Sequence, residues 1–261
     1  MSPRLELHSS FPVSTKRMIR NTLGDRSVRR VKSLRTRVSS NLGVGPWRRP
    51  GINKLDVLLA DAIGRLRGGT FIELGGNDGL QASNSFLLER ELGWRGILIE
   101  AIPELAAEAQ RNRPDAIVVC AAATSSNRSA IIGMEYEDLT SKVHAGASDF
   151  MVATTTISTV IDHVMSGDAP DLLSVDVEGH ELEVIAGLDL ARHRPRWILV
   201  ETDSPESVSR ALAGYTCVAQ LSYHDYLYEQ GDVIELDGRS FHRHSGFGRP
   251  SLRHSRARPN A

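Results

Sequence analysis

A glycine-rich turn after an apolar segment is the first feature of the chain whose residue types are suited to chemistry. Residues 71–79 read Phe-Ile-Glu-Leu-Gly-Gly-Asn-Asp-Gly, and a helix is expected to follow them. Glycine has no Cβ atom, so Gly75, Gly76 and Gly79 let the backbone turn sharply and approach a ligand. The start of the next helix offers N–H groups that suit a carboxylate or a phosphate. The segment predicts a ligand-binding loop that also includes Asn77.

The spacing of these glycines favours one ligand class. Dinucleotide-binding loops carry Gly-x-Gly-x-x-Gly, and the run from Gly75, Gly-Gly-Asn-Asp-Gly, does not have that spacing. It has instead the looser Glu/Asp-x-Gly-x-x-x-Gly pattern of proteins that bind S-adenosylmethionine (SAM). Glu73 precedes the loop, where a carboxylate suits the ammonium group of SAM, directly or through water, better than it suits a pyrophosphate. We therefore predict SAM as the cofactor.

A second acid, Glu100, closes the next apolar segment at residues 96–100. A carboxylate at the end of the second strand can accept both hydroxyls of a ribose, a geometry that NAD and SAM sites share. Glu100 follows Gly79 by 21 residues, which is about the expected separation. It is predicted to bind the ribose of the cofactor.

A third group of ionisable side chains follows the apolar segment 172–175. Asp176, Glu178 and His180 alternate along the chain, and ligands of open α/β sheets bind beyond the carboxyl ends of the strands. If the methyl group of SAM is transferred to a hydroxyl group of a second molecule, the acceptor, a base must take the proton of that hydroxyl. Asp176 is the first candidate, and His180 the second because imidazole titrates near neutrality. Glu178 is expected to bind the acceptor or to accept N–H groups at the following helix start.

The same acids leave a divalent metal open as an alternative. Asp176, Glu178, Glu201 and Asp203 all stand at or near the ends of predicted strands, and oxygen ligands suit Mg²⁺. In that interpretation Asp176 would be a metal ligand near the acceptor. The spacing does not decide the question, and no metal site is predicted.

The apolar patterns around these residues predict strands that alternate with helices, which is typical of βαβ units and a parallel sheet. The expected strands are 70–74, 96–100, 116–120, 130–134, 172–175, 196–201, 216–221 and 226–229, and the expected helices are 55–66, 83–92, 103–111, 158–165, 181–190 and 204–213. The polar stretch 133–156 is interpreted as a lid or an insertion over the site. Cys120 and Cys217 are interpreted as small core residues.

The net charge of −1 conceals two basic ends. Residues 1–50 carry +10 and residues 236–261 carry +5, which leaves −16 on residues 51–235. We predict a basic leader at 1–50 that is partly helical or disordered, a methyltransferase domain at 51–237 and a basic disordered tail at 238–261. The acidic body argues against a domain specific for nucleic acid, and no pattern indicates an oligomeric state.

Apolar residues recur at helical spacing in the leader, with Arg and Lys between them; they are Ile19, Leu23, Val31, Leu34 and Val38. A surface helix packed on the body, peripheral contact with an anionic membrane, binding of a polyanion and disorder all stay open as interpretations. Because no secretory signal and no apolar run long enough to span a bilayer are found, a cytoplasmic location is expected, at most peripheral to a membrane.

The motifs together resemble those of the FkbM family of methyltransferases. They are Ile-Glu-Leu-Gly-Gly-Asn-Asp-Gly, then Ser83-Asn84-Ser85, Ile-Glu-Ala-Ile-Pro, Ser-Val-Asp-Val-Glu-Gly-His-Glu and Ile-Leu-Val-Glu201, and they cover residues 70–201, extending toward 228. The Asp-Val-Glu-Gly-x-Glu segment is the specific part. Two departures are small: Gly76 stands where the family often has Ala, and Ala101-Ile102 replaces a Pro-containing turn.

The resemblance implies a class I methyltransferase fold, an α/β Rossmann-like fold with a seven-stranded, mostly parallel sheet and an antiparallel last strand. It also implies SAM as cofactor, with Asn84 counted among the cofactor-binding residues. The implied reaction is O-methylation of a hydroxyl on a saccharide, glycolipid or secondary metabolite.

The sequence disfavours two other functions. A nucleotide-dependent oxidoreductase is disfavoured by the loop spacing and by the lack of a Tyr-x-x-x-Lys pair in the sequence. A catalytically silent binding or trafficking protein, docked to a membrane by the leader, is disfavoured by the intact glycine loop and the two acids Glu73 and Glu100.

Overall fold

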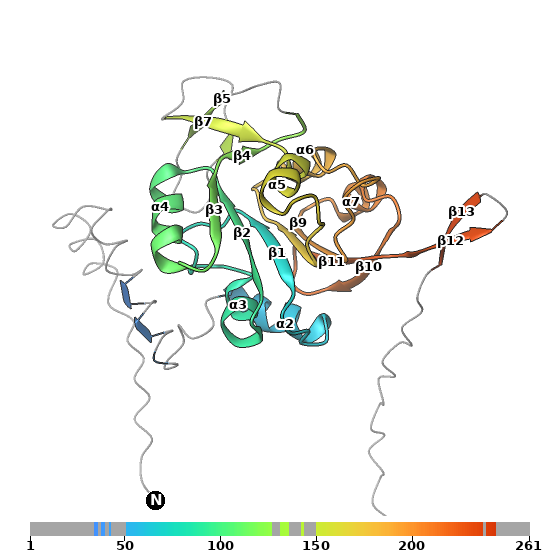
Figure 1. The fold of residues 1–261 in the computed structure, drawn as a ribbon, viewed down its shortest axis with the longest axis horizontal. Helices are drawn as coiled ribbons and strands as arrows, with labels where there is room; N and C mark the ends of the chain where they lie inside the picture. The colour runs from blue at the N-terminus through green and yellow to red at the C-terminus, as the bar shows by residue number, and fades with distance from the viewer. Residues whose placement is uncertain are drawn as a thin grey trace, which may run out of the picture.

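The computed structural model describes residues 51–126, 131–135, 142–143, 150–236 and 239–243, together with positions 34, 35, 38, 39 and 42. A seven-stranded sheet lies at the centre, in the order β10-β11-β9-β8-β1-β2-β3 (Figure 1). Its strands are β1 (Thr70–Leu74), β2 (Arg95–Glu100), β3 (Ile117–Cys120), β8 (Leu172–Val175), β9 (Trp197–Glu201), β10 (Tyr215–Gln220) and β11 (Asp225–Gln230).

Only β11, among the strands of this sheet, is antiparallel to its neighbours β9 and β10; the other pairs are parallel. The predicted class I methyltransferase fold, with an antiparallel last strand, is therefore confirmed. The chain order reverses between β1 and β8, and such a switch point is where open α/β sheets bind their ligands.

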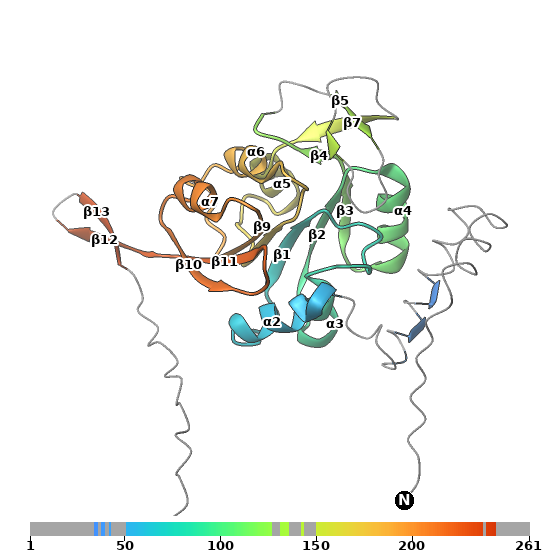
Figure 2. The ribbon, with the colours of Figure 1, turned by 180° about the vertical axis from the view of Figure 1, so that it is seen from behind.

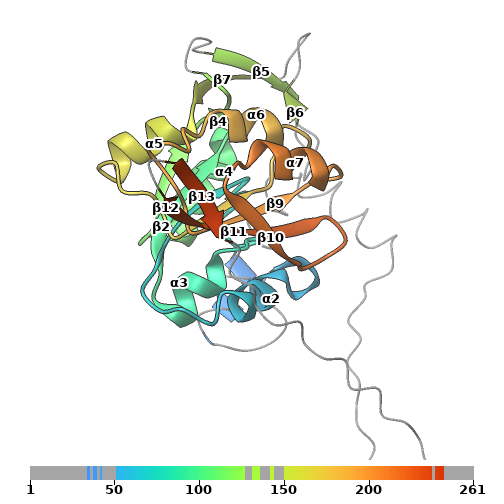
Figure 3. The same cartoon turned by 90° about the vertical axis from the view of Figure 1, so that its right-hand side faces the viewer.

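Helices cover both faces of the sheet, as Figures 1 and 2 show. One face is covered by α2 (Leu55–Ala62), α3 (Phe86–Leu92) and α4 (Pro103–Asn112), with the short η2 (Ile52–Lys54) ahead of them. The other is covered by α5 (Ile157–Val164), α6 (Glu181–Ala186) and α7 (Pro205–Ala211). Figure 3 shows this second set across the sheet from α2 and α3. Each set encloses its own apolar core.

Alternation along β1 decides which core each side chain enters. Ile72 and Leu74 belong to the core under α5, α6 and α7, whereas Phe71 belongs to the core under α2, α3 and α4. Glu73 therefore points to the same face as Phe71. This direction separates Glu73 from the other predicted site residues.

Four helices are shorter than predicted; those expected at 55–66 and 204–213 span Leu55–Ala62 and Pro205–Ala211. The helix expected at 83–92 begins at Phe86, because Ser83, Asn84 and Ser85 are engaged by the carboxylate of Glu73. The helix expected at 181–190 ends at Ala186. Gly187 follows, at a point where a Cβ atom would lie 2.2 Å from the carbonyl oxygen of Thr124.

The stretch interpreted as a lid or an insertion contributes to a second, four-stranded sheet in the order β4-β7-β5-β6. Its strands are β4 (Ala122–Ala123), β5 (Ile131–Glu135), β6 (Lys142–Val143) and β7 (Phe150–Thr155). Because β4 follows β3 directly, this sheet rises from the edge where the strands of the central sheet end (Figure 1). The sequence pattern predicted only the strand near β5.

The predicted boundary at residue 237 needs a correction. β12 (Asp232–Leu236) pairs with the antiparallel β13 (Arg239–Arg243), so the first part of the tail predicted to be disordered is a strand. Asp237-Gly238 stands between the two, and Asp-Gly between strand-forming residues is a strong hairpin signal. The rest of the predicted tail, from residue 244, lies outside the described residues.

The predicted leader lies mostly outside the described residues as well. Its described positions, from Leu34 to Leu42, are helical. Leu34 is 56% and Val38 47% exposed, so these two apolar residues do not pack into the body. Contact of the leader with a membrane stays a prediction. No helix within the described part of the chain has the length and apolar character needed to cross a bilayer.

The expectation for the cysteines was wrong. Cys120 and Cys217 are both exposed and unpaired with each other. They lie on β3 and β10, the two edge strands of the central sheet. An edge strand has one neighbour instead of two, which leaves its side chains less covered even where the local sequence is apolar.

The register of β1 against β8 is held at its start by Asp171. Its Oδ2 atom accepts from the backbone N–H and the hydroxyl of Thr70, at 2.8 and 3.1 Å. We expect Asp171→Ala to lower the free energy of unfolding by about 1–3 kcal/mol, because the Thr70 donors lose their acceptor. Urea denaturation measures this. Thr70→Val removes the hydroxyl together with the bond that it accepts from the Asp171 N–H. In that background Asp171→Ala should still destabilise the protein, and no further loss there would contradict a role for the backbone bond.

Candidate functional site

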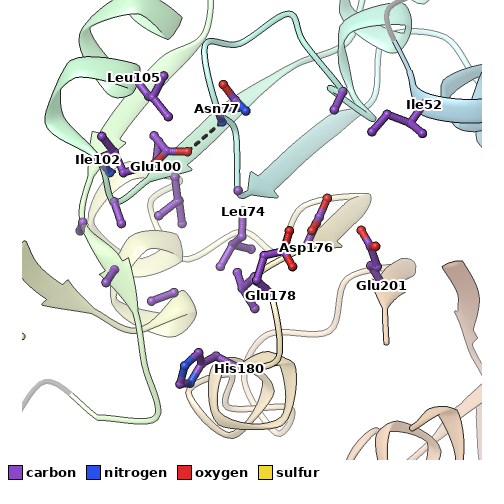
Figure 4. A pocket seen from close by; sticks show the side chains of 18 residues that line it. Ile52, Leu74, Asn77, Glu100, Ile102, Leu105, Asp176, Glu178, His180 and Glu201 are labelled. Carbon is purple, nitrogen blue, oxygen red and sulfur yellow. Dashed lines mark hydrogen bonds between the residues drawn. The ribbon is translucent and has the colours of Figure 1, made fainter. Parts of the chain in front are cut away.

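A cavity of about 220 Å³ lies at the carboxyl ends of β1, β2, β8 and β9. Figure 4 shows Glu100 and Asn77 on one side of it, with Asp176, Glu178 and Glu201 on the opposite side. The cavity is thus at the switch point of the sheet. Four of its lining residues are acids, and none of those described is Lys or Arg.

The glycine loop forms one wall by close backbone contact. Gly75 has φ +76°, and a Cβ atom there would lie 2.1 Å from the carbonyl oxygen of Asp176. The N–H groups of Gly75 and Gly76 both donate to the carbonyl of Ile99, at 3.1 and 3.3 Å. The loop is therefore held against both neighbouring strands, β8 and β2, and a side chain at Gly75 would force β1 and β8 apart.

Glu100 is the acid at the end of β2, and its two oxygens are both held by backbone. Oε2 accepts from the N–H of Asn77 and Oε1 from the N–H of Ile102, both at 2.8 Å. Burial raises the pKa of Glu100 to about 7, although its backbone hydrogen bonds oppose the shift. Each carboxylate oxygen has a second lone pair. Glu100 is thus oriented in advance for two further donors from the cavity.

Asp176 follows β8 and Glu201 ends the neighbouring strand β9, and these two cavity-lining acids form the Asp176–Glu201 pair. Burial and the neighbouring charges of Glu201, Glu178 and Asp225 raise the pKa of Asp176 well above its usual range. Asp176 therefore keeps its proton to a higher pH than an isolated aspartic acid does.

Glu178 and His180 complete this side of the cavity. Glu178 is exposed and has φ 52°, a left-handed conformation that a side chain seldom adopts. His180 caps α6, and its Nδ1 atom lies 3.6 Å from Oε2 of Glu183. It is the Glu181 side chain that accepts an N–H before this helix, from Gly179 at 2.6 Å. Glu178 and His180 both line the cavity.

The structure brings some predicted cofactor residues together and leaves others apart. Gly75, Asn77 and Glu100 line the cavity. Gly76, Gly79 and Asn84 do not line the cavity. The two glycines pack closely against neighbouring elements: a Cβ atom at Gly76 would lie 3.1 Å from Leu98 Cβ, and one at Gly79 would lie 3.1 Å from Ala109 Cα. Asn84 is buried and donates to the hydroxyl of Ser174.

Glu73 does not line the cavity. It is 2% exposed, on the face of the sheet that it shares with Phe71. Its carboxylate accepts from the N–H of Asn84 at 2.7 Å and from the hydroxyls of Ser83 and Ser85, and it is paired with Arg113. In this geometry Glu73 does not reach the cavity, so it cannot contact a cofactor ammonium there directly. The strict alternation of β1 was the sequence signal that pointed away from the cavity.

Two residues of importance here were not among the predicted site residues. Glu201 was named only as a conditional metal ligand, because sequence spacing does not reveal that β9 lies beside β8. Arg113 had no signal beyond its charge. Among the described residues, no group of three or more His, Cys, Asp or Glu side chains has the arrangement that a metal ion requires.

The comparison with protein families agrees with this geometry. The model of the methyltransferase FkbM domain matches residues 73–229, which spans the glycine loop, Glu100 and the Asp176–Glu201 pair. The chain belongs to the FkbM methyltransferase family. The resemblance read from the motifs is thereby confirmed. No curated protein matches the chain.

Several solved structures resemble it at low identity. The FkbM methyltransferase of Methylobacillus flagellatus is 17% identical, with a TM-score of 0.41 over 64% of this chain and 45% of its own. The O-methyltransferase of Bacillus cereus, solved in complex with SAH, is 14% identical, with a TM-score of 0.42 over 82% and 96%. The chain thus spans less than half of the first of these proteins.

Gly75 offers a direct test of the packing at the site. Gly75→Ala is expected to lower the free energy of unfolding by about 2–5 kcal/mol, since overpacking adds about 1–3 kcal/mol to a left-handed strain of about 1–2 kcal/mol. Gly93→Ala is the matched control, because Gly93 has φ +71° and nothing lies within 4 Å of its Cβ position. Chemical denaturation that gives equal losses for the two variants would contradict the contact with Asp176.

Proposed function

We propose that this chain binds SAM in the cavity and methylates a hydroxyl oxygen of a saccharide, glycolipid or secondary metabolite. The observation that carries the proposal is the placement of Glu100 and the Asp176–Glu201 pair on opposite sides of one cavity. The first is suited to a ribose and the second to the removal of a proton. Membership of the FkbM family supports the reaction class.

The charge of the cavity fits this cofactor. SAM carries a sulfonium and an ammonium against one carboxylate, so its net charge is positive. The lining offers Glu100, Asp176, Glu178 and Glu201, without a Lys or Arg among the residues described. A pyrophosphate would be repelled by these acids, which weighs against the oxidoreductase alternative. Bound SAM supplies an electrophilic methyl group, so the protein has only to align the acceptor and take up its proton.

Glu100 is the residue proposed to bind the ribose. Its oxygens are already held by Asn77 and Ile102, which lowers the entropy lost when the ribose hydroxyls donate to the remaining lone pairs. Because Gly75 holds the loop against β8, Glu100 and Asp176 border the same cavity, and they would hold the cofactor and the acceptor side by side.

The Asp176–Glu201 pair is proposed to accept the acceptor proton. The carboxylate of Asp176 would take the proton of the acceptor hydroxyl, while SAM would supply the methyl group and leave as S-adenosylhomocysteine. A raised pKa makes the ionised form a stronger base at neutral pH. His180 lines the same cavity and remains the second candidate. The acids also favour an uncharged hydroxyl acceptor over a phosphorylated or carboxylated one.

The role of Glu100 is tested by calorimetry with SAM. Glu100→Ala is expected to weaken SAM binding at least tenfold, whereas Glu104→Ala, on the exposed first turn of α4, should leave it unchanged. Because the pKa of Glu100 is about 7 and the ionised form accepts both hydroxyls, wild-type affinity should rise roughly tenfold from pH 6 to pH 8. Glu100→Gln should lose most of this rise. An unchanged affinity in Glu100→Ala would remove the ribose assignment.

The role of the acid pair is tested by transfer of labelled methyl from SAM to a panel of saccharides. An ether product, stable to mild alkali, supports O-methylation, and transfer to nitrogen would overturn it. Asp176→Asn should reduce kcat at least about a hundredfold.

Glu201→Gln removes the charge that raises the pKa of Asp176, so the acid limb of the kcat–pH profile should move to lower pH. Asp203→Asn is the control, because this acid is 88% exposed and paired with His224. An acid limb that stays in place in Glu201→Gln would contradict the role of Asp176 as a base whose pKa is raised by Glu201.

A further inference from the structure

Arg113, the residue that follows α4, is completely buried although it carries a charge. Its guanidinium lies between two carboxylates: Nη2 is 2.7 Å from Oε2 of Glu89, and Nη1 is 3.4 Å from Oε2 of Glu73. Its carbon Cζ also lies 5.1 Å from the ring centre of Phe71 and 5.8 Å from that of Phe86. A buried charge is stable only when it is paired and hydrogen-bonded, and Arg113 satisfies both conditions.

The guanidinium also holds the end of the glycine loop. Nη1 donates to the hydroxyls of Ser83 and Ser85, at 3.2 and 3.0 Å, and Glu73 accepts from the same two hydroxyls. These residues close the segment between β1 and α3. Arg113 and Glu73 together therefore fix where the loop ends, from the face of the sheet that lies away from the cavity.

The last turn of α4 supports the middle of the same loop. The side-chain amide of Asn112 donates to the carbonyl of Asp78 at 2.7 Å. A Cβ atom at Gly79 would meet Ala109 Cα at 3.1 Å and the Arg113 side chain at 3.3 Å. The loop thus lies directly on the helix end that Arg113 terminates.

The beginning of the loop is held from the cavity side. The N–H of Asn77 donates to Glu100, the residue proposed to bind the ribose. Residues 77–85 are therefore held at one end by Glu100, which lines the cavity, and at the other end by Arg113, which lies away from it. A displacement of the far end would be transmitted to Asn77, and through it to the orientation of the Glu100 carboxylate.

We infer that Arg113 is a positioning residue for cofactor binding: through Ser83, Ser85 and Glu73 it sets the loop that orients Glu100. It does not line the cavity, so it acts without touching the cofactor. This inference rests on the proposed function. It assigns to the Glu73–Arg113 pair the role of shaping the loop, in place of direct contact with the cofactor ammonium.

The test compares Arg113→Met with the wild-type chain by amide hydrogen exchange and by calorimetry with SAM. In the absence of ligand, exchange of residues 77–86 should become at least tenfold faster, while β8 and β9 stay protected. The Kd for SAM should rise at least tenfold at a temperature at which both proteins are folded. Arg111→Met is the control, because it removes the same charge from the same helix at a side chain that is 57% exposed.

A second variant separates loop positioning from general stability. In Glu73→Gln/Glu89→Gln/Arg113→Met all three members of this charge cluster become neutral, which often restores the stability lost when a single member of an ion pair is removed. We expect stability to recover while SAM affinity stays weak, because the hydrogen bonds from the guanidinium to Ser83 and Ser85 are still missing. Recovery of affinity together with stability would overturn the inference, as would unchanged exchange and affinity in Arg113→Met.

Failure of the proposed function would look different. If the wild-type chain does not bind SAM, the cofactor assignment fails. The exchange measurement needs no ligand, so it still reports whether Arg113 holds residues 77–86. Unchanged exchange in a folded Arg113→Met protein overturns the inference whatever the outcome with SAM.

Discussion

The approach of Gly75 to the carbonyl of Asp176 is the contact on which the rest of the site depends. A Cβ atom at Gly75 would lie 2.1 Å from that oxygen, so the first loop and the end of β8 form one surface. The cavity extends from this contact in both directions, to Glu100 on β2 and to Glu201 on β9. A methyl donor and an acceptor must meet in line, and adjacent strand ends bring their binding groups within reach of each other.

The site also depends on the burial of its acids. Burial raises the pKa of Glu100 and of Asp176, and for Asp176 the charge of Glu201 adds to the effect. The charge of Glu201 opposes ionisation of Asp176, so the pKa of Asp176 lies above the usual range of an aspartic acid. The acidic lining that produces these shifts is also complementary to a positively charged sulfonium nucleoside.

Residues at the end of β1 face two different parts of the molecule. Leu74 and Gly75 reach the cavity, whereas Glu73 turns to the opposite face and is enclosed with Arg113. One face of the strand borders the cavity, and the side chains on the other face hold the glycine loop that forms a wall of the cavity. Such support matters because the loop contains few regular backbone hydrogen bonds of its own, so its shape depends on the side chains that surround it.

The sequence by itself determined the order of strands and helices, the glycine loop, and the presence of Glu100 and Asp176 at strand ends, since each of these is a local pattern of periodicity and turn residues. The hairpin of β12 and β13 carried a local Asp-Gly signal too, although the tail composition obscured it. Only the tertiary structure decided that Glu201 lies beside Asp176, that Arg113 is the partner of Glu73, and that β4 to β7 form one sheet. Spacing along the chain shows which residues reach a strand end, but which ends are neighbours, and which buried charges meet, follows from strand order and packing.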